Sequence, residues 1–245
     1  TKAALRTGPG LVRLATAKSL LPVVGAALPE PVLMGLEESE EGQMLWEDKL
    51  RDWVERASVI AIGCGLRTGI QGAQLLEEVL RHRRSPLILD ADGINLLAQW
   101  PELLDRLGPE CLITPHPLEF SRLTGRPVAE IEGNRIQAAR EFAQRTGALV
   151  LLKGSRTVVA APDGRFYVNH TGNSGLAKGG SGDVLTGIIL ALLAQGYDPS
   201  TAAVLANYFH GEAGDLFAAR SSETALIASD IIDNLPEVFK SFEDR

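Results

Sequence analysis

Cysteine is scarce in this chain: its 245 residues include only two, Cys64 and Cys111, in separate apolar stretches. Two isolated thiols cannot form a disulfide framework, and no clustered Cys/His spacing of the kind that holds a structural metal is present. The plainest interpretation is a reduced, cytoplasmic protein with buried thiols and no metal ligands that spacing alone can identify.

Basic charge and long apolar runs are also in short supply. Lys and Arg number 24 against 31 Asp and Glu, so the formal net charge is -7, which argues against a nucleic-acid partner because phosphate binding requires a basic face. The dense basic run "RHRRS" (81–85) is expected to be a solvated helix end. No apolar run approaches the ~20 residues that span a bilayer, so no membrane partner is expected.

Short apolar runs alternate with longer helical patterns along the first two thirds of the chain, which is typical of parallel βαβ units. The near-continuous apolar content of these runs predicts a central sheet covered on both faces. The expected central strands are 31–36, 58–63, 86–91, 111–114 and 149–153, with helices near 43–56, 69–82, 94–99, 117–123 and 132–146.

The alternation of strand and helix patterns ends after the fifth of these strands. The stretch "TVVAAPDGRFYVN" (157–169) has two strand-like runs around a Pro-Asp-Gly turn, which predicts an antiparallel hairpin at the sheet edge. Three helices are expected to follow, near 182–195, 201–219 and 229–240. With no repeat and no linker, the prediction is one α/β domain over 1–245, which begins partway into its fold because "AALRTGPGLV" resembles the end of a helix and a turn.

The most informative stretch is "GLAKGGSGDVLTG" (175–187), which holds five glycines and one carboxylate ahead of an apolar helix. Gly179, Gly180 and Gly182 lie just before or within the first turn of that helix. Unpaired backbone N–H groups and the positive end of the helix dipole form an anion site there, and glycine allows a phosphate to approach closely. No Gly-Lys-Ser/Thr follows, which excludes a Walker A loop.

Asp183 lies beside this predicted anion site, where a negative charge is unfavourable unless it has a role. The role that fits is that of a base that takes a proton from a hydroxyl as the hydroxyl attacks phosphorus. The alternative is an ordinary acidic residue in the first turn of a helix. From the loop alone the two interpretations have equal weight.

Other polar residues follow predicted strands, where parallel sheets gather their ligands. Lys153 ends one strand and is either a ligand contact or a solvated lysine. Asp90 and Asp92 are either partners of a ligand or of Mg²⁺ waters, or Asx turns that cap the next helix.

In "TPHPLEF" (114–120), His116 is held between two prolines, with Glu119 one turn on, which suits substrate contact better than core packing. The stretch "GCGLRTG" (63–69) misses the dinucleotide-binding spacing by one residue and is interpreted as a close-approach turn. His210 and His82 are expected to be packing histidines, and His170 has no assignment.

Together these segments resemble the ADP- or ATP-dependent NAD(P)H-hydrate dehydratases, relatives of the ribokinase-like kinases, over residues 3 to 238. The most specific matches are "GNSGLAKGGSGDVLTGIIL" (172–190), "TPHPLEF" (114–120), "LLKGSRTVV" (151–159), "DADGINLLA" (90–98) and "NYFHGEAGDL" (207–216). A glycine loop ending in Asp is shared by the wider superfamily, whereas the five segments together are specific to the dehydratases.

The resemblance implies a ribokinase-like three-layer fold, with a mostly parallel central sheet, helices on both faces and an antiparallel hairpin edge. It further implies repair of hydrated cofactors, NADHX and NADPHX, with ADP or ATP as phosphoryl donor and Mg²⁺ beside the nucleotide. Asp183 would be the base and touch the substrate. The nucleotide would lie against Lys153, Gly154, Ser155, Arg156, Thr157, Gly179, Gly180, Ser181 and Gly182, and the hydrated nicotinamide against Gly63, Gly65 and His116.

The sequence departs from the family pattern at Cys64, Arg67, Leu118 and Lys178. Lys178 is either a phosphate contact or a solvated residue. Family members normally begin with a further strand and glycine-rich turn, and many carry an epimerase domain upstream. Two alternatives therefore stay open: a small-molecule kinase of the hydroxyethylthiazole-kinase type, and an inactive chain that binds nucleotide. ADP is favoured over ATP by the "TPHP" form, and a homo-oligomer is compatible with the apolar helices of the last third.

Overall fold

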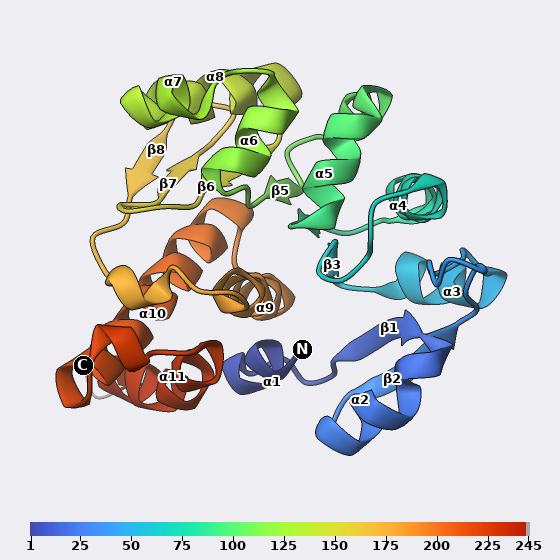
Figure 1. The fold of residues 1–245 in the computed structure, drawn as a ribbon, viewed down its shortest axis with the longest axis horizontal. Coiled ribbons are helices and arrows are strands. Elements are labelled where there is room, and N and C mark those ends of the chain that lie inside the picture. Colours follow the sequence, from blue (N-terminus) through green and yellow to red (C-terminus); the bar gives the residue numbers. More distant parts are fainter. Residues whose placement is uncertain (244–245) are drawn as a thin grey trace.

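The computed structural model describes residues 1–243 and consists of helices packed on both sides of a sheet (Figure 1). The strands are β1 (Arg13–Ala17), β2 (Val32–Leu36), β3 (Ile60–Ile62), β4 (Leu87–Leu89), β5 (Cys111–Ile113), β6 (Leu149–Leu152), β7 (Val158–Ala160) and β8 (Phe166–Val168). The α-helices are α1 (Lys2–Thr7), α2 (Leu21–Ala27), α3 (Asp48–Arg56), α4 (Ile70–His82), α5 (Asp92–Gln99), α6 (Pro117–Thr124), α7 (Val128–Gly133), α8 (Arg135–Thr146), α9 (Ser181–Ala194), α10 (Pro199–Arg220) and α11 (Ala228–Glu243). Short 3₁₀ turns cover Lys18–Leu20, Pro101–Arg106, Ser174–Leu176 and Glu223–Ala225.

The central sheet has six strands in the order β3-β4-β5-β6-β7-β8. Strands β3 to β6 are parallel, whereas β7 pairs antiparallel with β6 and β8 antiparallel with β7. The predicted parallel sheet with an antiparallel hairpin edge is therefore confirmed. The hairpin turn falls at Pro162–Gly164, where the backbone of Gly164 has a positive φ of 89°.

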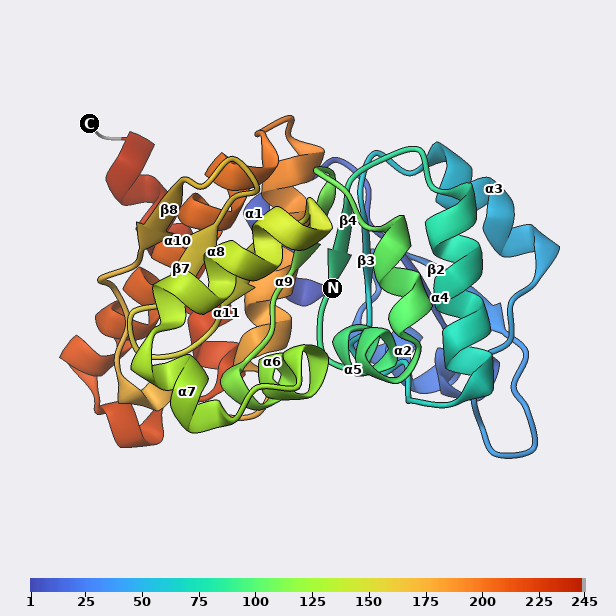
Figure 2. The same cartoon turned by 90° about the horizontal axis from the view of Figure 1, so that it is seen from above.

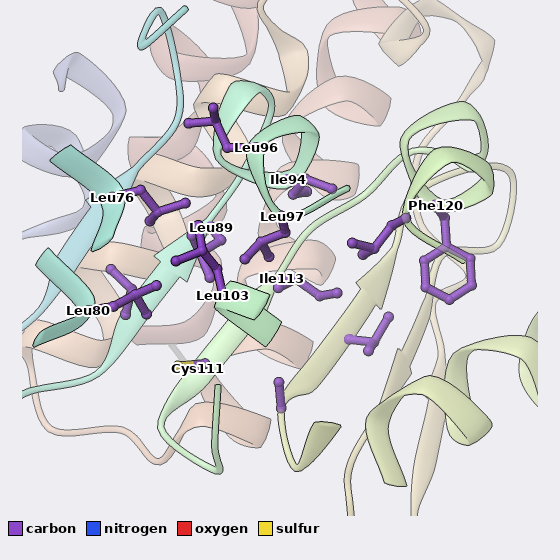
Figure 3. Close-up of a cluster of buried hydrophobic side chains, with 14 of the residues drawn as sticks. Leu76, Leu80, Leu89, Ile94, Leu96, Leu97, Leu103, Cys111, Ile113 and Phe120 are labelled. Atoms are coloured by element: carbon purple, nitrogen blue, oxygen red, sulfur yellow. The ribbon is translucent and has the colours of Figure 1, made fainter. Parts of the chain in front are cut away.

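The strands are apolar throughout because each one contributes to two cores. On β4, Leu87 and Leu89 face the core beneath α3, α4, α5, α6 and α8, whereas Ile88 faces the core beneath α9, α10 and α11. β5 repeats the pattern, since successive side chains of a strand point to opposite faces. Figure 2 shows the resulting three layers from above, and Figure 3 shows the first core, where Leu76 and Leu80 of α4 meet Leu89 of the sheet.

The N-terminal part differs from the prediction. The strand expected at 31–36 does not belong to the central sheet: β2 pairs in parallel with β1 in a separate two-stranded sheet. β1 and α2 were not predicted, because "RLATA" is short and polar at one end, and α2 buries none of its residues. α1 docks on α9 at Gly187, where a Cβ atom would lie 2.9 Å from the Cβ of Ala3.

Two further boundaries are corrected. The helix expected at 132–146 is two helices, α7 and α8, separated at Asn134, whose side chain accepts a hydrogen bond from the backbone N–H of Gln137 and so caps α8. The helix expected at 43–56 begins only at Asp48. Within residues 1–243, no helix combines the length and apolar content needed to cross a membrane.

We predict that Phe120→Ala lowers the free energy of unfolding by about 3–5 kcal/mol, because Phe120 is fully buried and packs edge-to-face on Phe142. Urea unfolding followed by circular dichroism measures this loss. Leu118→Ala on the same helix is the matched control: Leu118 is 48% exposed, so its replacement should change stability by about 0.5 kcal/mol or less. Equal losses in the two variants would contradict the assigned core.

Candidate active site

Most of the polar residues singled out in the sequence converge at one edge of the sheet. Gly63 and Cys64 follow β3, Asp90 follows β4, His116 follows β5, and Lys153 follows β6. The first turn of α9, which carries Asp183, lies against the same edge: a Cβ atom on Gly182 would be 3.2 Å from Lys153 Nζ and 3.9 Å from Asp90 Oδ2. This is the position expected of ligands in an open parallel sheet.

A buried ion pair lies at the centre of the site. Lys153 Nζ donates to Asp90 Oδ1 at 2.7 Å and is 3.9 Å from Glu119 Oε2. The other carboxylate oxygen of Asp90 accepts a hydrogen bond of 2.8 Å from the hydroxyl of Thr186 on α9. Asp90 is 1% exposed and does not cap the following helix, whose N-cap is Ala91, so the Asx-turn alternative is wrong for this residue.

The pKa values of the two carboxyl groups beside Lys153 shift in opposite directions. Burial disfavours the charged form of Asp90, but the Lys153 ammonium and the hydrogen bonds from Lys153 and Thr186 outweigh it, and the pKa of Asp90 lies below its usual value. For Glu119, burial dominates over the attraction of Lys153 and raises the pKa. Lys153 is thus committed mainly to Asp90, and Glu119 is the more readily protonated of the two.

The turn after β3 packs directly on the backbone of Asp90. A Cβ atom on Gly63, whose φ is 129°, would lie 1.8 Å from the Asp90 carbonyl oxygen, so only glycine fits there. Cys64 is exposed, unlike the buried Cys111, so the expectation of two buried thiols is wrong for Cys64. Desolvation, the charges of Asp90 and Asp183 and a hydrogen bond to Asp183 raise the pKa of this thiol.

The turn is completed by Gly65 and by Asp92. Gly65 is exposed and left-handed, and a Cβ atom on it would meet nothing within 4 Å. Asp92 Oδ2 accepts a 2.8 Å hydrogen bond from the backbone N–H of Arg67 and so holds the far end of the turn. The close-approach turn expected at 63–69 is therefore present.

The glycine-rich loop ends at the N-terminus of α9, as predicted. Gly180 is the N-cap residue with a left-handed backbone (φ 86°), and no side chain within the described residues caps the helix. The N–H groups of its first turn therefore face the exposed Gly179–Gly180 corner, where a Cβ atom on Gly179 would meet nothing within 4 Å. This geometry is that of an anion site.

The loop is held from behind by two carboxylates. Asp215 accepts hydrogen bonds from the Gly172 backbone and the Asn173 amide at 2.7 and 2.8 Å. Glu223 accepts from the Ser174 backbone at 3.1 Å and from its hydroxyl. Lys178 is exposed, and its ammonium group donates to the backbone carbonyls of Thr224 and Leu226.

Ser181 is buried beneath the loop against His210. The ring nitrogen Nε2 of His210 is 3.0 Å from the Ser181 carbonyl oxygen and 3.1 Å from its hydroxyl. A carbonyl only accepts, so Nε2 carries the proton, and burial lowers the pKa of His210 to about 4. The prediction of a packing histidine is confirmed, and His210 contacts Ser181, the first residue of α9.

His116 proves to be the N-cap of α6. Its Nδ1 accepts from the backbone N–H groups of Leu118 and Glu119 at 3.2 Å, while Glu119 Oε2 accepts from the His116 N–H at 2.8 Å. Nδ1 is therefore an acceptor, and the proton of the neutral ring is on Nε2. Desolvation and the charges of Lys153 and Arg122 lower the pKa of His116. Its Nε2 lies 3.3 Å from Glu119 Oε1, and its side chain is 45% exposed.

The segment predicted to line the nucleotide forms an exposed turn after β6. Gly154, Ser155 and Arg156 are exposed, and Arg156 has a left-handed backbone (φ 56°). Arg135 donates to the carbonyls of Leu152 and Lys153 at 2.9 and 3.0 Å and packs so closely that Gly154 has no room for a side chain. Thr157 is buried, and its hydroxyl donates to the Gly154 carbonyl.

Sequence reasoning missed Thr186 and the direct approach of Cys64 to the carboxylates. Thr186 follows Asp183 by one helical turn, so the spacing offered a signal, but nothing in the chain indicates that Asp90 is its partner. Donor atoms of Cys64, Asp90 and Asp183 lie within 4.8 Å of one another. His170 is exposed and lines a hollow between the hairpin and α10, outside the cluster.

We predict that His210 makes stability depend on pH. Its pKa in the folded state is about 4, below the 6.5 of the free residue, so the unfolded state binds the proton first and folding stability falls as pH decreases from about 6.5 towards 4. At about 1.4 kcal/mol per pKa unit, the loss reaches about 3 kcal/mol. Denaturant unfolding across this range should show a flatter profile for His210→Gln than for the native chain.

His82→Gln is the matched control, because His82 stacks on Trp46 at the surface end of α4. The change in profile between pH 6.5 and 4 should be larger for His210→Gln than for His82→Gln, because only His210 is buried in the core. A His210→Gln profile parallel to the native one would contradict the buried, neutral state of His210.

The chain and its fold are similar to known proteins. The family model of NAD(P)H-hydrate dehydratases matches residues 1–237. The chain is 38% identical over 242 residues to the ADP-dependent (S)-NAD(P)H-hydrate dehydratase of Bacillus subtilis. This match covers 98% of this chain and 82% of the relative. It is 39% identical over 245 residues to the bifunctional NAD(P)H-hydrate repair enzyme Nnr of Moorella thermoacetica, of which it spans only 46%.

Among solved structures, the ADP/ATP-dependent NAD(P)H-hydrate dehydratase from Bacillus subtilis, co-crystallised with ATP/Mg²⁺ and soaked with CoA, aligns with a TM-score of 0.80 at 33% identity. The alignment covers 98% of this chain and 84% of that one. Ribokinase-like superfamily proteins are also among the structural matches, which confirms the predicted fold class. The extent of these matches shows that the chain belongs to the NAD(P)H-hydrate dehydratase family.

Proposed function

We propose that this chain dehydrates hydrated NADH or NADPH to the reduced cofactor, with ADP or ATP as phosphoryl donor. The observation that carries the proposal is the placement of Asp183 in the uncapped first turn of α9, beside the anion site and within 4.8 Å of the Asp90 carboxylate cluster. The chain spans about half the length of the bifunctional relative and four fifths of the single-function one, so the activity of a longer protein is part of this proposal.

Asp183 would act as the base. It is exposed at the edge of the cluster, so an incoming hydroxyl can reach it, and no Lys or Arg side chain within residues 1–243 forms a salt bridge with it. A carboxylate that is not neutralised by a partner can accept the proton of the substrate's ring hydroxyl as that oxygen attacks the donor's terminal phosphorus. The first-turn N–H groups of α9 would stabilise the charge on the phosphoryl oxygens.

Phosphorylation would convert a poor leaving group, hydroxide, into a good one, phosphate. The ring nitrogen can then expel phosphate and restore the dihydropyridine, and the protein needs only to orient the intermediate and exclude competing water. The tight turn at Gly63 and the partly exposed ring of His116 would contact the hydrated nicotinamide. The exposed turn 154–156 would contact the nucleotide.

The donor set also suits Mg²⁺, the ion expected beside the nucleotide. Asp90 offers its Oδ2, a carboxylate oxygen of the kind that hard cations prefer, because Lys153 engages Oδ1. When bound, Mg²⁺ would neutralise charge on the phosphate oxygens. Lys153 would share that task, since it is fixed between Asp90 and Glu119 at 2.7 and 3.9 Å.

The small-molecule kinase is the second candidate, since Asp183 would serve there in the same way. It predicts a stable phosphoester as product, whereas the dehydratase predicts free phosphate and reduced cofactor. The kinase is less favoured by the comparisons, because two relatives with more than a third of their residues identical are named as an NAD(P)H-hydrate repair enzyme and an NAD(P)H-hydrate dehydratase. An adenine nucleotide and NADHX or NADPHX in the cytoplasm are the partners this proposal implies.

Incubation of the protein with enzymatically hydrated NADH, Mg²⁺ and either ADP, ATP or no nucleotide tests the function. We expect recovery of the near-ultraviolet absorbance of NADH together with one phosphate released per cofactor, dependent on nucleotide and faster with ADP. Nucleotide binding without phosphate release would favour an inactive binding chain. A phosphoester that accumulates would favour the kinase.

We predict that Asp183→Asn lowers turnover by about 10² or more while nucleotide affinity changes little, because the base is lost but the anion site is backbone. Steady-state kinetics and calorimetric nucleotide titration measure the two effects. Asp198→Asn is the control, since Asp198 also lies at the start of a helix. It is the N-cap residue of α10 and follows the C-terminal end of α9. Near-native turnover of Asp183→Asn would remove it from this role.

A further inference from the structure

The cluster at the edge of the sheet contains a sulfur that the proposed reaction does not use. Cys64 Sγ lies 3.8 Å from Asp90 Oδ2, and the donor atoms of Cys64, Asp90 and Asp183 are all within 4.8 Å of one another. The three residues come from separate elements: the turn after β3, the end of β4 and the first turn of α9. The Cys64 thiol donates to Asp90 Oδ2, so one residue of each element contributes a donor atom to the same place.

We propose that Cys64, Asp90 and Asp183 form a binding site for a thiophilic divalent cation such as Zn²⁺ or Cd²⁺. One thiolate and two carboxylates match the ligands of tetrahedral zinc, with bonds of about 2.3 Å to sulfur and about 2.0–2.2 Å to oxygen. A cation placed between donors that are at most 4.8 Å apart reaches these lengths with small side-chain movements. The fourth position would be taken by water.

The two oxygens of Asp90 allow this without breaking the ion pair. Oδ1 accepts from Lys153 at 2.7 Å, whereas Oδ2 accepts from the Thr186 hydroxyl at 2.8 Å and from the Cys64 thiol at 3.8 Å. The hydroxyl can rotate away, and the thiol gives up its proton when it binds a cation. The positive groups that face the cluster are the Lys153 ammonium, which Asp90 already engages, and the amino group of Thr1, which interacts with Cys64 and Asp183.

Sulfur determines which cation the site selects. Mg²⁺ prefers oxygen ligands and keeps several of its waters, whereas a thiolate favours zinc and cadmium. On binding, the Cys64 thiol releases its proton to solvent and the thiolate forms the bond to the cation. The pKa of the Cys64 thiol is raised, so the thiol stays protonated when no such cation is bound.

The consequence for activity rests on the proposed function. A cation bound to Asp183 occupies the carboxylate that would accept the substrate proton, so Zn²⁺ should inhibit turnover and saturating substrate should slow inhibition. Binding itself is independent of that function, because the direct test needs no turnover.

Cadmium titration of the untagged protein, followed by the ultraviolet absorption of the cadmium–thiolate bond in excess Mg²⁺, tests the site. We expect the native chain to bind one equivalent of cadmium and to show this absorption. In Cys64→Ser and in Cys64→Ala the absorption should be lost and the affinity for cadmium lowered at least ~10-fold. Cys111→Ser is the matched control and should keep the absorption, because Cys111 is buried in the opposite core. Asp183→Asn should weaken binding but keep the absorption.

Absorption that persists in both Cys64 variants, or a native chain that binds no cadmium, would overturn the proposal. Cadmium bound without the thiolate absorption would indicate another place, for example His82 with Glu55 and Glu78 on the surface, and would also overturn it. If cadmium binds through Cys64 yet the hydrated cofactor is never dehydrated, the site stands and the proposed function fails.

Discussion

The buried pair of Asp90 and Lys153 is the interaction on which the geometry of this site depends. A carboxylate that is 1% exposed is tolerated only with a full set of partners, since an unpaired buried charge is destabilising by several kcal/mol. Lys153 supplies the charge and Thr186 the second hydrogen bond. Because these partners follow β6 and lie on α9, one carboxylate joins two strand ends to the helix that carries Asp183.

The anion site depends on that helix in turn. Its backbone N–H groups need to stay free and aimed outward, so the loop before α9 is fixed from the rear. Asp215 and Glu223 hold residues 172–174, Lys178 ties the loop to the carbonyls of Thr224 and Leu226, and His210 holds Ser181. These polar side chains hold the loop through hydrogen bonds to its backbone and side chains.

Under the proposed function, the site would have to bind both a cation and a phosphate. His116 and His210 are both held towards their neutral forms by desolvation, and Lys153 is shared between Asp90 and Glu119. The helix dipole and backbone groups supply the positive potential that a phosphate needs, whereas the carboxylates supply the oxygen ligands that a divalent cation needs. Cys64 adds a soft ligand to a set that would otherwise favour hard cations.

The sequence by itself determined the strands of the central sheet, the hairpin edge and the helix that follows the glycine loop. These elements are encoded locally, by apolar runs buried on both faces, by turn residues such as Pro162–Gly164 and by apolar residues at helical spacing in α9. It also singled out Asp90, His116 and Lys153, because polar residues that follow parallel strands lie where such sheets bind ligands, and Asp183, because it follows the glycine-rich loop at the start of a helix.

Only the tertiary structure decided which of these residues meet and what each one does. It separated β2 from the central sheet, made His116 a helix cap, used Lys178 and Thr157 as internal supports and placed Cys64 beside two carboxylates. Such pairings join residues far apart in the chain, as Thr186 and Asp90 are. They follow from how strands and helices pack, which periodicity and spacing along one chain do not record.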